Sequence, residues 1–187
     1  MQLKSSVLRP LLGLMVAASV SVGAYAALPA MGAFAETHSN CATFDNNGNV
    51  VSVVPNCSQT IHAPSGASSS PSTDPCNGAT GTATMNDIHD IFHVNVNGAG
   101  DVWITNTDNG TFTFVPDDPT MPSGSGQWSA WFGGSLNNQN TVLTSTFNLT
   151  VHLSDGSVVT NHEIMHVTFS ASGPNFSFDK PVLSCGG

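Results

Sequence analysis

The stretch TVLTSTFNLTVHLSDGSVVTNHEIMHVTFSA, residues 141–171, decides the fold. Two runs rich in valine, threonine and phenylalanine flank Ser154-Asp155-Gly156, which is typical of a three-residue hairpin loop with glycine in the left-handed position. Pairing across that loop places Val151 opposite Val159. One face of the hairpin then carries Leu143, Phe147, Leu149, Leu153 and Val167, and the other carries His152, His162, Ile164, His166 and Thr168. Because both runs agree on the apolar face, the stretch predicts an antiparallel hairpin in this register.

The same alternation of strand-like runs and turn signals extends through the preceding part of the chain. Runs with β-branched and aromatic residues lie at 79–85, 87–96, 101–107, 111–115 and 127–132, and another follows the hairpin at 176–184. Turn signals separate several of them, among them NGAG at 97–100 and DNG at 108–110. We therefore expect an all-β fold, a small antiparallel β-barrel or β-sandwich of seven to eight strands.

Residues 1–35 have the three parts of a secretory signal peptide. Lys4 and Arg9 precede an apolar run, LLGLMVAASVSVGAYAAL, and small residues follow it. Cleavage is expected after Ala33-Phe34-Ala35, with Ala24-Tyr25-Ala26 as the other candidate. Retention as a membrane anchor is the alternative, since the apolar run approaches the ~18 residues that span a bilayer. We expect removal, and hence a mature protein that is secreted, extracellular or periplasmic, and free of the membrane.

The mature chain is expected to have two parts, residues 36–75 and residues 76–187. In the first, Asn46-Asn47-Gly48-Asn49 separates two short extended runs, and residues 58–75, SQTIHAPSGASSSPSTDP, are rich in serine and proline. Such a composition is typical of a linker. The second part is the antiparallel β domain, which is long enough to bury a core.

Four cysteines, Cys41, Cys57, Cys76 and Cys185, predict two disulfides in a secreted chain, with three possible pairings. Cys41 and Cys57 flank the N-terminal hairpin, whereas Cys76 and Cys185 bracket the β domain. We therefore expect the pairs 41–57 and 76–185. A zinc site is the alternative use of four cysteines, but no Cys-x-x-Cys pair occurs.

After signal removal the chain would keep all twelve of its carboxylates and a single Lys or Arg, Lys180. So acidic a surface repels phosphate backbones and anionic lipid headgroups. Nucleic acids and membrane surfaces are therefore not expected as partners. The expected partner is an unidentified extracellular ligand or protein.

The run His162-Glu163-Ile164-Met165-His166 matches the HExxH pattern of zinc proteases. That chemistry needs a helix, in which both imidazoles reach one zinc ion and the glutamate activates water. Here the run continues the hairpin strand, where residues four apart lie about 13 Å from each other. Zinc–nitrogen bonds are about 2 Å long, so these two histidines cannot share an ion. We interpret the run as strand, not as a protease site.

Histidines also alternate in the run at 87–96, where His89 and His93 share a face. If this strand were the neighbour of the strand with His162 and His166, histidines of the two would come within about 5 Å and could bind a transition metal. The simpler interpretation, which we prefer, is a solvent face of histidines among threonines and asparagines.

Asp90 and Glu163 fall on the expected apolar faces of their strands. A lone buried carboxylate is unfavourable unless it is paired or hydrated. In a barrel mouth the two would be acids with pKa values raised by burial and suited to proton transfer. The structural alternative, which we prefer, is that they mark strand ends or that the inward assignment is off by one residue at these positions.

Tryptophans could stack on sugars if exposed. Trp128 and Trp131, three apart in a strand, must face opposite ways, so they do not form one platform. At least one of Trp103, Trp128 and Trp131 is expected in the core.

Two stretches, PCNGATGTATMNDIHDIFHVNVNGAGDVW and NHEIMHVTFSASGPNFSFDKPVLSC, resemble a group of small secreted bacterial β-rich proteins of unassigned function. The likeness covers about residues 75–185. It rests on a cysteine ahead of a histidine-containing first strand, a histidine-rich strand near the end and a final cysteine. It implies the β fold, the Cys76–Cys185 link and a strand for HEIMH, and it implies no activity.

The sequence thus favours a secreted, acidic, non-enzymatic binding or structural module of the cell exterior, without a cofactor. The first alternative is a cofactor-independent enzyme or small-ligand binder with a barrel cavity lined by Asp90 and Glu163. The second is metal binding through the four histidines of the two strands. These possibilities are distinguished by which face of residues 157–171 points inward.

We expect the mature chain to resist trypsin even when it is unfolded and reduced. Its only Lys or Arg is Lys180, and Pro181 follows it, which makes a peptide bond that trypsin cleaves poorly. Mass spectrometry of the reduced mature protein after digestion measures this. Rapid fragmentation would show that the mature chain is not the one that begins near residue 36.

Overall fold

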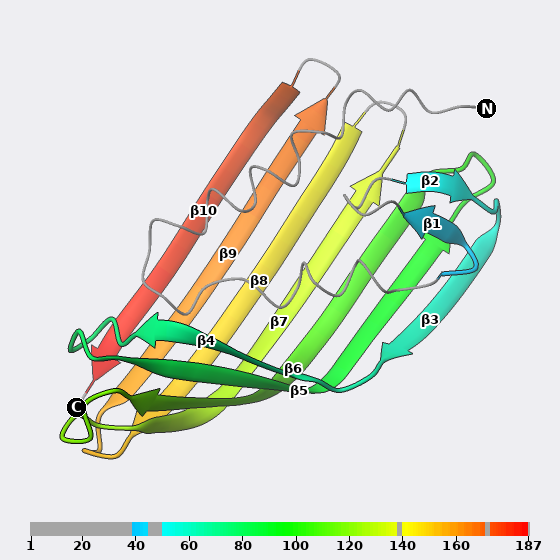
Figure 1. Cartoon of the computed structure of the whole chain (residues 1–187). Coiled ribbons are helices and arrows are strands. Elements are labelled where there is room, and N and C mark those ends of the chain that lie inside the picture. Colours follow the sequence, from blue (N-terminus) through cyan, green and yellow to red (C-terminus); the bar gives the residue numbers. More distant parts are fainter. Residues whose placement is uncertain (1–38, 45–49, 138–139, 171–172, 187) are drawn as a thin grey trace.

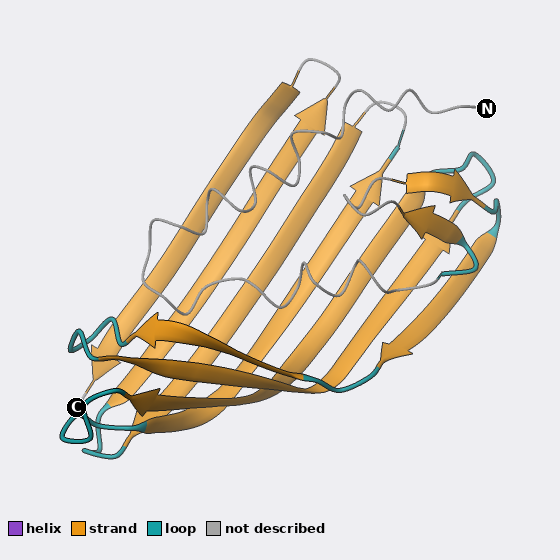
Figure 2. Cartoon of the chain, viewed as in Figure 1, coloured by secondary structure: helices purple, strands orange, loops and turns teal. Residues whose placement is uncertain are grey.

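In the computed structural model the chain forms a long antiparallel sheet and a separate two-stranded hairpin (Figure 1). The structure describes residues 39–44, 50–137, 140–170 and 173–186. Every regular element among them is a strand, and turns and loops join the strands (Figure 2). The expected all-β antiparallel fold is confirmed, but the sheet is not closed into a barrel.

The strands are β1 (Ala42–Phe44), β2 (Val50–Val53), β3 (Cys57–Ala63), β4 (Ala67–Thr73), β5 (Thr80–Val96), β6 (Val102–Pro116), β7 (Gly124–Leu136), β8 (Asn140–Leu153), β9 (Val158–Ser170) and β10 (Gly173–Gly186). The sheet has the order β10-β9-β8-β7-β6-β5-β3, and β4 also pairs with β5. Each strand from β5 to β10 therefore pairs with the next along the chain. The topology is a meander in which local turns set the register.

The β8–β9 hairpin has the register expected from the sequence. Val151 pairs with Val159 and Leu143 pairs with Val167. Gly156 has a positive φ of 90°, and its backbone N–H donates to the carbonyl of Leu153 at 3.1 Å. Glycine adopts this conformation without the steric cost that a side chain imposes, so the short loop fixes the whole pairing.

The long strand β5 turns a corner. Its first part pairs with β4 and its second part pairs with β3, and a bulge lies between Asp87 and His89. Bulges bend a strand and increase its twist. Figure 1 shows the consequence: the start of β5, β4 and the end of β6 curve over one face of the sheet.

The curved part packs on β7 and also on β8 and β9, which are not its hydrogen-bonded neighbours, and this contact forms the larger core. Phe112 and Phe114 of β6 and Ala83 of β5 pack there with residues of β7, β8 and β9. The other buried members are Ala79, Trp128, Leu149, Val151, Leu153 and Val159. The sheet thus covers its own apolar face at one end, as two layers of a sandwich would.

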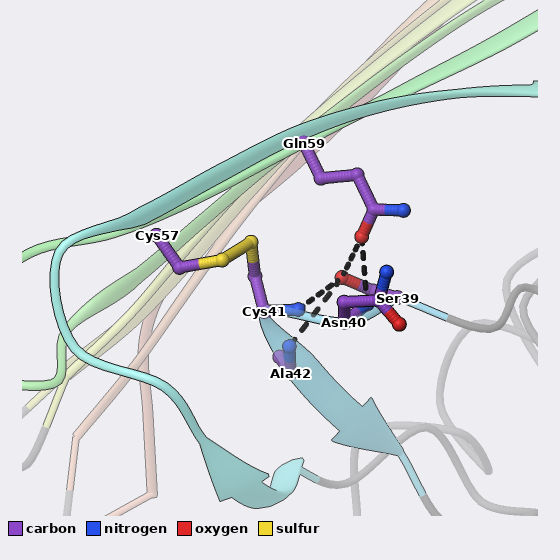
Figure 3. The surroundings of a disulfide bond; sticks show 6 residues. All are labelled: Ser39, Asn40, Cys41, Ala42, Cys57 and Gln59. Carbon is purple, nitrogen blue, oxygen red and sulfur yellow. Dashed lines mark hydrogen bonds between the residues drawn. A yellow bond between two sulfur atoms is a disulfide. The ribbon is translucent and has the colours of Figure 1, made fainter.

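The opposite end is covered by the β1–β2 hairpin. Its Cys41 and Ala42 pack with Phe92, Val94 and Ile104 in a second core. The disulfide Cys41–Cys57 joins the hairpin to β3 (Figure 3). Gln59 of β3 adds to this join, because its side-chain oxygen accepts hydrogen bonds from Ser39 Oγ and the backbone N–H of Asn40.

The second disulfide, Cys76–Cys185, joins the β4–β5 connection to the end of β10. It crosses from the curved part to the far edge of the sheet. Both expected disulfides are therefore confirmed, and no cysteine is free among the described residues.

The segment expected to be a linker, residues 58–75, lies mostly in the sheet. It supplies β3 and β4, each of which pairs with β5. The side chains of β4 are exposed except for that of Ser72, so hydrogen bonds to β5, not apolar burial, hold it. Pro71 is compatible with this edge position, since an edge strand has one side without ladder partners.

A second sequence prediction is also wrong. The turn expected at DNG does not form, because residues 108–110 lie within the strand β6. Asp108 pairs with Asp90 of β5 and with Ala130 of β7. A Cβ atom at position 110 would lie 1.8 Å from the carbonyl oxygen of Asn86. Gly110 therefore allows β5 and β6 to approach each other closely and does not form a turn.

Two sequence predictions lie outside the described residues. These are the signal peptide at 1–35 and the turn at Asn46–Asn49, although the strands that flank this turn, β1 and β2, do pair. Within the described part of the chain, no helix has the length and hydropathy to cross a membrane.

Removing the Cys76–Cys185 disulfide should destabilise the protein more than removing Cys41–Cys57. The two bonds close loops with sequence separations of 109 and 16 residues. In the chain-entropy model such loops are worth about 4.7 and about 3 kcal/mol. We expect the double variant Cys76→Ser/Cys185→Ser to lose more unfolding free energy in urea than Cys41→Ser/Cys57→Ser. Equal losses would contradict this ranking.

Candidate functional site

The two faces of the sheet differ in burial. In β6 the even-numbered side chains from Val102 to Phe114 are buried, and the odd-numbered ones are half-buried or exposed. We call the face that carries the two cores the inner face, and the opposite one the outer face. Outer-face side chains occupy alternate positions from His89 to Asn95, Trp103 to Thr113, Ser125 to Ser135, Val142 to His152 and Val158 to Thr168.

The faces differ just as much in charge. The outer-face positions of β5 to β9 hold threonine, serine, asparagine, glutamine, histidine and a few apolar residues, but no Asp, Glu, Lys or Arg. The carboxylates of these strands, Asp87, Asp90, Asp108 and Glu163, all lie on the inner face. The formal net charge of the chain is −9, so an outer face without carboxylates is a distinct feature of its surface.

Three inner-face carboxyl groups cluster at the corner of β5. Asp90 pairs with Asp108, and Asp87 lies on the other side of the bulge. The Nδ2 of Asn106 donates a hydrogen bond of 2.5 Å to Asp90 Oδ1. The cluster lies between the two cores, where the sheet bends; Asp90 and Asp108 are buried there and Asp87 is half-buried.

Burial raises the pKa of each of the three groups. For Asp108, which is only 5 % exposed, burial and then the charges of Asp87 and Asp90 raise the pKa to about 7. Burial is also the main cause of the raised pKa of Asp87, to which Asp90 adds. The pKa of Asp90 is raised by burial, against the hydrogen bond from Asn106, which lowers it.

Asp108 has an incomplete set of partners. The backbone N–H of Asn109 donates to its carboxylate, but Oδ1 has no hydrogen-bond partner in the described part of the chain. A buried carboxylate is costly when it is charged and short of partners. Asp108 should therefore be mostly protonated below neutral pH.

The two expected acids, Asp90 and Glu163, both lie on the inner face but are not brought together. They occupy one cross-strand row, in which Asp108, Ala130 and Phe147 stand between them. Four strand spacings amount to about 19 Å along the sheet. The pKa of Glu163 is raised by burial and then by the charge of Asp179 on β10, so its electrostatic neighbour is not Asp90.

Sequence reasoning missed Asp108 and Asp87 as partners of Asp90. The missed signal is the alternation from Val102 to Phe114, in which every second residue is apolar except Asn106, Asp108 and Gly110. Reading that alternation through DNG, instead of stopping at a turn signal, places Asp108 on the inner face.

The HEIMH run is strand, as expected, because residues 162–166 lie within β9. His162 contacts Asn148 of β8 through a 2.5 Å hydrogen bond, and Nδ1 of His166 lies 2.8 Å from Thr144 Oγ1. These partners on the neighbouring strand fix the two imidazoles on the outer face.

The condition for a shared metal between the histidine strands is not met. His93, which hydrogen bonds with Thr60 of β3, lies on β5, and β6, β7 and β8 separate β5 from β9. His89 contacts the carbonyl of its neighbour Ile88. Within the described ranges, no three His, Cys, Asp or Glu side chains are placed to hold a metal ion.

The tryptophans divide between the faces as expected. Trp128 is 2 % exposed in the larger core, where its ring stacks on Phe147 at 6.4 Å between centroids. Trp131 and Trp103 lie on the outer face and are 40 % and 41 % exposed. The outer face thus combines two accessible indole rings with uncharged polar side chains.

Comparisons of the chain with protein-family models, with curated proteins and with solved structures found no match.

The stability of the protein should fall as the pH rises from about 4 to about 7. The pKa of Asp108 is about 7 in the folded state and about 3.9 in an unfolded chain, so the folded state binds the extra proton in this window. Asp108→Asn keeps the shape without the charge. Between pH 4.5 and pH 8, we expect the unfolding free energy of this variant to fall by a few kcal/mol less than that of the wild-type protein.

Urea unfolding at the two pH values measures this difference. Asp117→Asn is the control, because Asp117 is an exposed carboxylate in the loop after β6. If Asp108→Asn and Asp117→Asn change the pH dependence equally, Asp108 is not the group responsible.

Proposed function

We propose that this chain is a secreted, non-enzymatic binding module of the cell exterior, and that its outer face is the binding surface. The observation that carries the proposal is the outer face itself: its positions in β5 to β9 hold no Asp, Glu, Lys or Arg in a chain of net charge −9, and it exposes Trp103 and Trp131. The edge strand β10 adds one cation to this face, Lys180, which pairs with Ile164.

The composition of the outer face suits contact with a ligand. Burying a carboxylate or an ammonium group without a partner is far more costly than burying a hydroxyl or an indole. The centres of protein binding surfaces are accordingly depleted in charged residues and enriched in tryptophan. A face that is uncharged within an acidic protein can be covered at a lower desolvation cost than the rest of its surface.

The proposed location follows from the cysteines. All four are paired in the two disulfides, which indicates an oxidising, non-cytoplasmic environment. Secretion through the expected signal peptide at residues 1–35 is part of the proposal. The resemblance of residues 75–185 to small secreted bacterial β-rich proteins points the same way.

The inner face has a different role in this proposal. Its apolar side chains form the two cores and a smaller cluster around Leu143 and Val167, and its acids are split between the corner of β5 and the strand β9. Asp90 and Glu163 are too far apart along the sheet to act on one small substrate. A binding function on the outer face therefore accounts for more of the described surface than catalysis on the inner face does.

The test is retention of the purified protein on washed, insoluble extracellular material of the cells that make it. Thr107→Glu/Thr146→Glu places two charges beside Trp131, since Thr107 and Thr146 are its cross-strand neighbours. We expect the retained fraction to fall severalfold in this variant. No retention of the wild-type protein at any concentration would refute the proposal.

Two controls accompany this test. Ser123→Glu/Ser154→Glu adds the same two charges at the exposed end of the sheet, where the backbone N–H of Ser154 donates to the Ser123 carbonyl. Asp90→Asn/Glu163→Gln changes the inner face alone. Both controls should be retained like the wild type. Loss of retention in the inner-face variant would favour the alternative built on Asp90 and Glu163.

A further inference from the structure

Trp131 has the most central position on the outer face. It lies on β7, which is the middle strand of the order β10-β9-β8-β7-β6-β5-β3. Thr107 of β6 and Thr146 of β8 flank it. Trp131 therefore lies near the middle of the outer face across the strands.

The indole of Trp131 lies over Gly133. A Cβ atom at position 133 would be 2.4 Å from the Cη2 atom and 2.8 Å from the Cζ2 atom of this ring. Glycine at 133 therefore gives the ring the space to lie along the strand, with one side toward the sheet and the other toward solvent. At 40 % exposure the solvent side remains accessible.

Trp103 provides a second ring on the same face. It lies on β6 and pairs with Ser135, four residues along β7 from Trp131. The two Cα atoms are thus separated by about 13 Å along the strands and one strand spacing, about 4.8 Å, across them. Because the ring of Trp131 reaches over Gly133, it extends toward the row of Trp103.

Hydroxyl and imidazole groups surround the two rings. Thr105 and Thr144 pair with Gly133 from either side, and His93 and His166 pair with these two threonines. Such groups donate and accept hydrogen bonds without carrying a full carboxylate or ammonium charge. The described surface around Trp131 can therefore bind a ligand that is rich in hydroxyl groups.

The charge distribution restricts the ligand to an uncharged one. An anionic polymer would be repelled by a chain of net charge −9. A cationic polymer would find no carboxylate at the outer-face positions of β5 to β9. Sugar rings have apolar faces that stack on aromatic rings and hydroxyl groups at their edges that hydrogen bond, and a polysaccharide repeats this chemistry along an extended chain.

We propose that the outer face binds an uncharged polysaccharide, with sugar rings stacked on Trp131 and Trp103. This inference rests on the proposed function and specifies the ligand class of the same surface.

Affinity electrophoresis of the intact, disulfide-bonded protein tests it, with gels that contain a soluble uncharged β-glucan, a galactomannan or a xyloglucan. Sedimentation with insoluble cellulose and chitin extends the panel, and polygalacturonate and chitosan serve as charged polymers. We expect binding to at least one uncharged polysaccharide. Trp131→Ala should weaken it about tenfold or more, as the loss of an aromatic stacking partner does elsewhere.

Three variants control this result. Trp131→Phe keeps a ring at the position and should retain more affinity than Trp131→Ala. Trp103→Ala should weaken binding as well. Val115→Ala removes an exposed apolar side chain of the same strand as Trp103, away from both rings, and should bind like the wild type. Unfolding in urea establishes that the variants are folded.

Several results would overturn the inference. These are binding to charged polymers alone, no binding to any member of the panel, or binding that neither tryptophan substitution weakens. A dimer in analytical ultracentrifugation that Trp131→Ala dissociates would show that a second copy of the chain covers the face instead. If the protein is retained on extracellular material through the outer face but binds no uncharged polysaccharide, this inference fails and the proposed function stands. If the protein is not retained on extracellular material and binds no uncharged polysaccharide, both this inference and the proposed function fail.

Discussion

The curvature of the sheet is the constraint on which the rest of the structure depends, and the Cys76–Cys185 disulfide secures it. A single open sheet exposes both of its faces, and one of them must be covered for the domain to be stable. This chain covers the inner face by bending β5 and β6 back over β7, β8 and β9, so one sheet supplies both layers of its core. The disulfide then joins the curved end to β10, the strand farthest from it in the sheet order. The bond thus replaces, at one end, the hydrogen-bonded closure that a barrel would have.

The bend also explains the buried acids. The bulge between Asp87 and His89 shifts the alternation of β5, so that Asp87 and Asp90 both reach the inner side of the corner, where Asp108 of the next strand joins them. Three carboxyl groups in so small a volume oppose one another when charged, and the pKa of about 7 for Asp108 reflects burial together with that repulsion. The corner is therefore a part of the fold whose stability is expected to depend on pH.

How much of this could be predicted from the sequence depended on the range of the interaction involved. The β8–β9 register followed from Ser154-Asp155-Gly156 and the alternation on either side, because both signals are local. The disulfide pairs were also predictable, because few pairings exist. The strands at 57–63 and 67–73 were not, since serine-rich β4 is held by hydrogen bonds to β5 and not by side chains that a pattern could reveal. Asp108 was missed for a related reason: Gly110 marks close contact with the Asn86 carbonyl, which no local turn rule distinguishes from a loop.

Covering one face with the chain itself leaves the other face free, and the distribution of charge follows from that division. The four carboxyl groups within strands β5 to β9 lie on the inner face, so the chain is acidic without placing charge on the outer surface of these strands. The hydrogen bonds of His162 to Asn148 and of His166 to Thr144 join side chains of neighbouring strands across the outer face. A rigid, uncharged surface loses little conformational entropy and little charge solvation when it is covered. The same bend that forms the core therefore leaves the outer face as the surface that we propose for binding.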